Sequence, residues 1–199
     1  MGKTDIVHQT KLAFDFIEKI YLEISYLIKE LEGLLGEEEE GFIIGKPSGY
    51  SITSRSSQGL ESTNVSLWSL KKMSVFFIAK GLTRLSGGVT ATAFSNELKL
   101  IYLRIILDER DISEPYIVLG VFYDFIDMHK KWPTKFEQLM AHMEYHEGKV
   151  FSNRETVDFE DSNTKFKGKL FRVNLFDIGS SEDIVKLVVT PLLEIYRNI

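Results

Sequence analysis

The residues with the clearest potential for chemistry are two histidines, His142 and His146, four positions apart. The surrounding pattern predicts a short helix near 134–147, and residues four apart on a helix project from neighbouring turns on one side. Two imidazoles so placed could bind one divalent metal ion, with His129 and Asp127 as further ligands. The order His-Glu-x-x-His of metalloproteases is not present. Two interpretations stay open: a metal site, or histidines that border the hydrophobic core on a helix flank.

A second candidate is the basic segment 62–96, which contains no acidic residue. Clustered cations attract phosphate and other anions, although no phosphate-loop spacing accompanies them here. The segment could therefore bind an anionic small ligand. Alternatively, its cations could face water or the acidic run 37–40, where such pairs contribute ~0–1 kcal/mol. The candidate ligand-binding residues are Arg55, Lys71, Lys72, Lys80 and Arg84.

Other catalytic patterns are incomplete. The chain has no cysteine, which excludes disulfides, thiolate metal sites and cysteine nucleophiles. Glu97-Leu-Lys99 matches half of a nuclease motif, but the acid-free segment before it lacks the upstream acid that the motif requires. No Gly-x-Ser-x-Gly elbow or Gly-x-Gly-x-x-Gly loop occurs. The alternating lysines of a later predicted strand, Lys165, Lys167 and Lys169, are interpreted as protection of a sheet edge rather than as a nucleic-acid stripe.

Composition and charge limit the class of protein. The 199 residues are 44% hydrophobic and 27% charged, so we expect a single globular domain over residues 1–199. The net charge of -5 disfavours binding to nucleic acid or to an anionic membrane. No apolar stretch approaches the roughly 20 residues that span a bilayer, and no signal-peptide pattern begins the chain. A cytoplasmic location is therefore expected.

The elements that must position these residues begin with a long amphipathic helix. Over about 4–35, apolar residues recur at three- and four-residue spacing, which is the helical period. A second apolar line repeats every seven residues beside the first, so the apolar face is wider than a two-stranded coiled coil requires. The helix should end before the run 37–40, because acids are disfavoured at the negative end of a helix dipole. The first line is Ala13, Ile17, Ile20, Ile24, Leu27, Leu31 and Leu34, and the second is Phe14, Tyr21, Ile28 and Leu35.

Short strand-like segments separated by breakers follow this helix. Two of them, 98–107 and 116–125, are apolar on both alternating faces and should be central strands. The short loop between them leaves no room for a helical crossover, so they should pair antiparallel. A C-terminal helix near 181–198 should be capped by Ser180 with Asp183 and broken or kinked at Pro191. The other predicted strands are near 42–46, 50–55, 65–79, 156–159 and 166–176.

Together these patterns predict an α+β fold, with the long N-terminal helix packed on a mostly antiparallel sheet of about six to seven strands. The leading functional hypothesis is a non-enzymatic binding or protein-interaction protein that forms a homo-oligomer. It is motivated by the missing catalytic motifs and by the wide apolar face of the first helix. The alternative is a metal-dependent hydrolase or nuclease with a divalent metal at His142 and His146. A central question is whether the second apolar line is covered by the protein's own sheet or by a partner.

Overall fold

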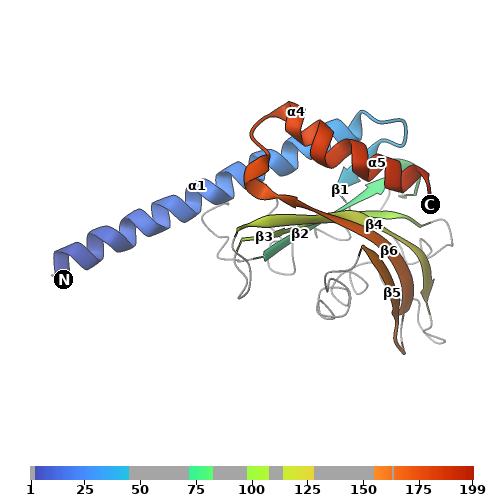
Figure 1. Ribbon diagram of the computed structural model, residues 1–199, viewed down its shortest axis with the longest axis horizontal. Helices are drawn as coiled ribbons and strands as arrows, with labels where there is room; N and C mark the ends of the chain where they lie inside the picture. The colour runs from blue at the N-terminus through green and yellow to red at the C-terminus, as the bar shows by residue number, and fades with distance from the viewer. Residues whose placement is uncertain (1–2, 45–71, 83–97, 108–113, 128–154, 163) are drawn as a thin grey trace.

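The computed structural model describes residues 3–44, 72–82, 98–107, 114–127, 155–162 and 164–199 (Figure 1). Within these residues the α+β fold is confirmed: a long N-terminal helix, a six-stranded antiparallel sheet and a helical C-terminal segment. The strand order is β1-β2-β3-β4-β6-β5, and neighbouring strands pair antiparallel throughout. The predicted strand near 50–55 and the predicted helix near 134–147 lie outside the described residues.

Helix α1 (Lys3–Gly36) has the predicted extent and ends directly before the acidic run. Its second half packs on one face of the sheet, whereas its first half extends beyond the sheet (Figure 1). After the helix the chain turns at Gly41, whose φ of +58° lies in the left-handed region that favours glycine. This turn brings strand β1 (Phe42–Ile44) back against α1.

The centre of the sheet consists of β2 (Lys72–Ala79), β3 (Leu100–Ile106) and β4 (Tyr116–Asp127). Every residue of β3 is buried, and β3 pairs with both neighbours along its length. Alternate β3 side chains enter two different hydrophobic clusters, with Ile101 on the α1 face and Tyr102 on the opposite face. The prediction of central strands covered on both sides is therefore confirmed.

Strands β5 (Thr156–Glu160) and β6 (Thr164–Asn174) complete the sheet, and β6 lies between β4 and β5. The interpretation of the alternating β6 lysines as edge protection is therefore wrong, because β5 occupies the edge. Lys165 instead pairs with Glu160, with 2.7 Å between Nζ and Oε2, and Lys167 pairs with Asp124, with 2.9 Å between Nζ and Oδ2. Such cross-strand pairs of opposite charge are a normal feature of antiparallel sheets.

The C-terminal segment consists of η4 (Leu175–Asp177), α4 (Ser181–Asp183), the π-helical stretch η5 (Ile184–Val189) and α5 (Thr190–Arg197). The predicted cap is present, since the Ser180 hydroxyl accepts a hydrogen bond from the Asp183 amide at 3.2 Å. Pro191 widens the preceding turn instead of ending the helix. The Thr190 amide donates to the Val185 carbonyl, five residues back, in the turn before the proline.

Candidate interaction surface

Most residues of the two sites predicted from the sequence lie outside the described part of the chain. Asp127 ends β4 and Lys72 begins β2, but only their main chains are described, whereas Lys80 is an exposed residue of the turn η2 (Lys80–Leu82). Among the described residues, no group of three or more His, Asp or Glu could hold a metal ion. Both site hypotheses remain predictions. The residues outside the description are His129, His142 and His146 of the metal site and Arg55, Lys71 and Arg84 of the anion site.

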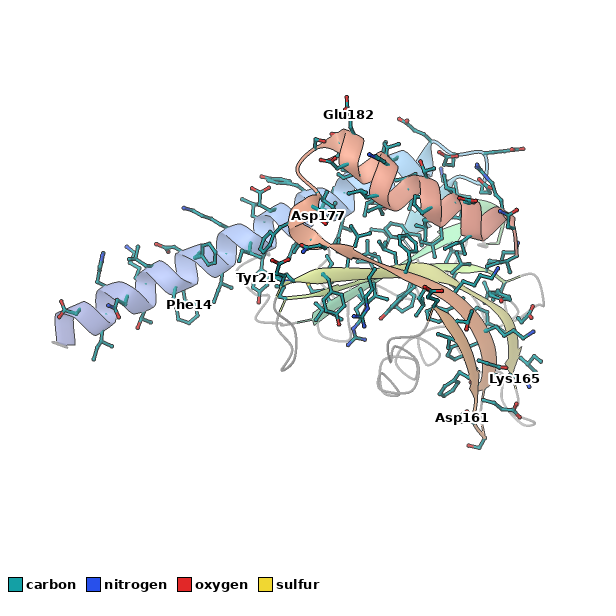
Figure 2. The ribbon with its side chains drawn as sticks, in the orientation of Figure 1. Phe14, Tyr21, Asp161, Lys165, Asp177 and Glu182 are labelled. Carbon is teal, nitrogen blue, oxygen red and sulfur yellow. The ribbon has the colours of Figure 1, made fainter. Side chains whose placement is uncertain are left out.

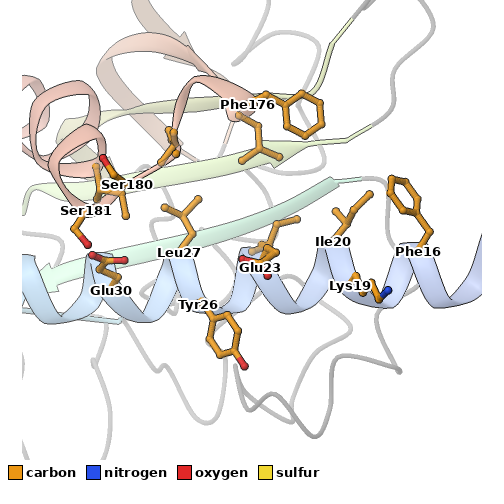
Figure 3. Close-up of a pocket in the computed structure, with 15 residues that line it drawn as sticks. Phe16, Lys19, Ile20, Glu23, Tyr26, Leu27, Glu30, Phe176, Ser180 and Ser181 are labelled. Carbon is orange, nitrogen blue, oxygen red and sulfur yellow. The ribbon is translucent and has the colours of Figure 1, made fainter.

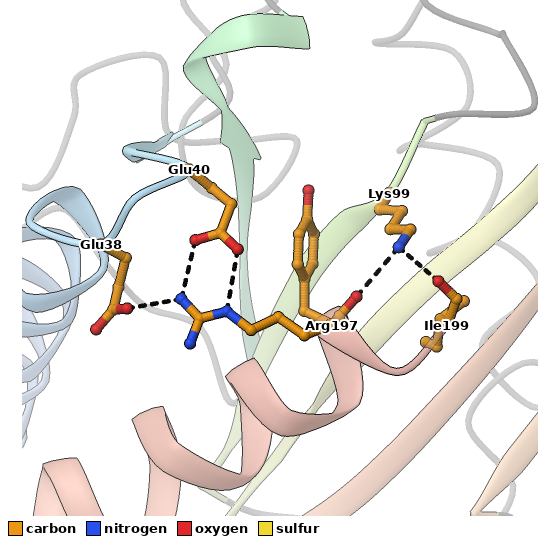
Figure 4. A network of polar contacts seen from close by, with 6 residues as sticks. Glu38, Glu40, Lys99, Arg197 and Ile199 are labelled. Atoms are coloured by element: carbon orange, nitrogen blue, oxygen red, sulfur yellow. Dashed lines mark hydrogen bonds and ion pairs between the residues drawn. The ribbon is translucent and has the colours of Figure 1, made fainter.

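Lys99, from the half-matched nuclease motif, is bonded to the C-terminal helix (Figure 4). Its ammonium donates to the main-chain oxygens of Tyr196 at 3.2 Å and Ile199 at 2.6 Å. It also lies 5.2 Å from the centre of the Tyr196 ring, and burial raises the pKa of that phenol. A cation is favoured at the negative end of a helix, so this lysine stabilises the end of α5.

Arg197 links α5 to the residues that follow α1 (Figure 4). Its guanidinium bonds Glu40 through Nε and Nη2, both at 3.1 Å, and Glu38 through Nη2 at 2.9 Å. The hydrogen bonds from Arg197 lower the pKa of the Glu40 carboxyl, and the two carboxylates raise the pKa of Arg197. The C-terminal helix thus holds the chain where α1 ends.

A buried polar cluster on the far face of the sheet was not anticipated from the sequence. The hydroxyls of Ser74 and Tyr102 are 2.9 Å apart, and Arg104 donates from Nη1 to the Tyr102 hydroxyl at 3.4 Å. Arg104 is only 4% exposed. The arginine was not expected within the apolar pattern of β3, and its Nη1 is hydrogen-bonded, as most buried polar groups are.

The first half of α1 presents an uncovered apolar surface, which we call the apolar stripe. Every residue from 5 to 19 is exposed, and Figure 2 shows Phe14 on the part of the helix beyond the sheet and Tyr21 beside the sheet. Phe14 is 63% exposed, whereas Tyr21 is 6% exposed, although both belong to the same predicted line. The stripe consists of Ile6, Val7, Leu12, Phe14, Phe16 and Ile17, which are 40–64% exposed.

The stripe continues the core-facing side of α1 without a change of direction. At 100° per residue, Ile6 and Ile17 fall within about 20° of the buried Ile24 and Leu35 when the helix is viewed along its axis. Ile24 is 2% exposed and Leu35 is fully buried on the sheet. The same side of one helix is therefore covered in its second half and exposed in its first.

A groove of about 590 Å³ borders the stripe (Figure 3). Its first wall is α1, and its second wall is η4 with the turn that follows it. Figure 3 shows Ile20 and Leu27 pointing from α1 toward the wall that bears Phe176, a side chain that is 68% exposed. Phe16 lines the groove and also belongs to the stripe, so the two surfaces are continuous. Charged and polar rim residues include Lys19, Glu23, Glu30 and Ser180.

No protein family, curated protein or solved structure matches this chain. In the part of the chain that the structure describes, no helix has an apolar stretch long enough to cross a membrane. The stripe and the groove are therefore the main basis for a functional proposal.

Proposed function

We propose that this protein is a non-enzymatic interaction protein that self-associates through the first half of α1. The observation that carries this proposal is the exposed apolar stripe. At typical side-chain areas, its six large residues present roughly 600 Å² in each copy. A patch of this size is at the upper end of what monomeric proteins expose, and such patches often have a binding function.

The charge of the first half of α1 favours a protein partner. Between residues 5 and 19 the cations are Lys11 and Lys19, and the acids are Asp5, Asp15 and Glu18, so with His8 neutral the net charge is 2 − 3 = −1. Helices that bind membrane surfaces or nucleic acid are instead rich in Lys and Arg.

A second copy is the partner whose chemistry is already present, because it carries the same stripe. Two copies related by a twofold axis would bury the stripe reciprocally. The stripes alone would then remove roughly 1,200 Å² from water, at the lower end of specific protein interfaces. Self-association therefore accounts for the apolar surface without a further component.

The proposal is tested by light scattering after size-exclusion chromatography and by sedimentation equilibrium. We expect the unmodified protein to form a dimer at micromolar concentration. Phe14→Ser and Ile17→Ser should each raise the dimer dissociation constant about tenfold or more, because each removes a large apolar contact. Asp15→Ser, on the opposite side of the same helix segment, is the matched control and should leave dimerisation unchanged. A protein that is still monomeric at about 100 μM has a dimer dissociation constant above that value, which is weaker binding than most specific interfaces show. That result for the unmodified protein would contradict the proposal.

A further inference from the structure

We propose that the groove between α1 and η4 receives the first half of α1 from a second copy, in an antiparallel and reciprocal arrangement. This inference rests on the self-association proposed above and specifies where the helix of the second copy lies. Phe16 is the first α1 residue that lines the groove and lies near the C-terminal end of the stripe, so each copy offers a donor helix and a receiving groove next to each other.

The width of the stripe favours a groove over a flat helix pair. At 100° per residue, the exposed apolar side chains cover an arc of about 220°, from Leu12 through Phe16 and Ile17 to Val7. A two-helix contact uses a narrower seam and would leave one side of this arc in water. A helix in a groove is contacted by two walls, so both sides of the arc are covered.

The directions of the side chains indicate which part of the stripe meets which wall. Phe16, Ile20 and Leu27 point within about 40° of one another around α1. In a symmetric antiparallel pair these sides face each other, with Phe16 near the twofold axis. Because the two helices run in opposite directions, Ala13 of one copy then lies opposite Ile20 of the other.

The sheet-facing side of the inserted helix meets the second wall of the groove. A twofold axis perpendicular to both helices and to the line joining them keeps the two sheets on the same side of the pair. Ile6 and Ile17 point toward that side, and η4 lies there too, because Leu175 and Ile178 pack against the hydrophobic cluster that contains the buried residues of α1. Leu175, Phe176 and Ile178 of this wall would therefore cover Ile6 and Ile17 of the second copy.

Insertion into the groove raises the buried area and keeps the charges in water. In addition to the stripe, each copy would bury the exposed ring of Phe176, so the total exceeds the roughly 1,200 Å² of the stripes alone. At the same register Gln9 lies within one residue of the level of Glu23 of the second copy, and both are exposed polar side chains. Glu23 and Glu30 stay on the rim, where water solvates them.

Cross-linking tests the register, and the absence of cysteine removes any background. The test variant is Ala13→Cys combined with Ile20→Cys. Under mild oxidation we expect a covalent dimer, with peptide mapping that shows a disulfide between position 13 of one copy and position 20 of the other. The matched control is Lys11→Cys combined with Glu18→Cys, which has the same spacing on the opposite side of the helix and should stay unlinked.

A second variant tests the groove separately from the stripe. Phe176→Ser should raise the dimer dissociation constant about tenfold, because the ring forms the second wall and lies outside α1. Val185→Ser is the control, since Val185 is 40% exposed but does not line the groove. A dimer that shows no 13–20 disulfide and is unaffected by Phe176→Ser would overturn the groove and leave self-association standing. A monomeric unmodified protein would overturn both.

Discussion

The two halves of α1 share one pattern and have opposite surroundings. In the second half, Ile24 is 2% exposed and Ile28 is fully buried on the sheet. In the first half, Phe14 and Phe16 are 63% and 64% exposed, although the apolar period continues through them. An amphipathic period thus shows that one face of a helix should be buried against other apolar residues. The tertiary structure decides whether those residues belong to the same chain.

The largest expected difference between the halves is in folding stability. Ile28→Ser should lower the free energy of unfolding by about 4 kcal/mol, because it leaves a cavity and buries a hydroxyl in an apolar site. Phe14→Ser should change it by less than about 0.5 kcal/mol in the monomer, as expected for an exposed position. Urea denaturation at sub-micromolar concentration measures both values. Equal losses would mean that Phe14 packs in the hydrophobic core of its own chain. The two halves of α1 would then not differ in burial.

Amide hydrogen exchange should separate the halves next. Amides of residues 21–35 should approach the protection of global unfolding, while those of residues 5–17 should exchange at least about tenfold faster in the monomer. Raising the protein concentration should slow exchange only in residues 5–17, because dimerisation covers that half. Mass spectrometry at sub-micromolar and at about 50 μM protein, on either side of a micromolar dissociation constant, gives the comparison. Exchange in 5–17 that is independent of concentration would count against any association through this segment.

The helix cap beside the groove should have a smaller effect. Ser180→Ala removes the hydroxyl that accepts from the Asp183 amide and donates to its carboxylate at 2.8 Å. We expect a loss of about 1 kcal/mol of unfolding free energy, measured by denaturation. Ser181→Ala, at the adjacent exposed position, is the control and should be nearly neutral. Equal effects would show that the cap does not stabilise the groove wall.

The smallest expected effect concerns the ion pair between Arg197 and Glu40, which holds the chain just after the C-terminal end of α1. The pKa of Glu40 in the folded protein lies below its ordinary value of 4.5, so its ion pair stabilises the fold above about that pH and is lost as the pH falls through the lower, folded-state pKa. Arg197→Met should remove this contribution. The contribution should be small, because the Arg197 side chain is 48% exposed and water screens the ion pair. Melting temperature should therefore fall less steeply below about pH 4.5 in the variant, and parallel curves would contradict this role.

Local patterns predicted the main elements of the fold. The period of α1, the cap at Ser180 and the two apolar faces of β3 were each visible in short stretches of sequence and are present in the structure. The position of β6 in the sheet could not be predicted in this way, because strand order depends on pairing with β5 and β4 rather than on the lysines of β6 itself. The edge interpretation failed for that reason.

The candidate surface could be predicted only in part. The sequence showed that α1 has a wide apolar face, but it did not separate Phe14 from Tyr21, which occupy equivalent positions in one line. One usable signal was length: the 34 residues of α1 extend about 51 Å, more than the roughly 40 Å of β4, whose 12 residues form the longest described strand. The groove could not be predicted from the sequence, because its walls bring together Phe16 and Phe176, which are far apart in the chain.

Because α1 is one helix from Lys3 to Gly36, its two halves share a single rotational phase. The direction in which the stripe points is therefore set by the packing of the second half on the sheet. Inserting one residue near Lys19 would turn the stripe by about 100° relative to the groove while leaving every side chain of the stripe in place. Inserting seven residues would restore the direction to within about 20° and shift the stripe by roughly two helical turns. Rotation and translation of the stripe relative to the groove can thus be varied separately within one helix.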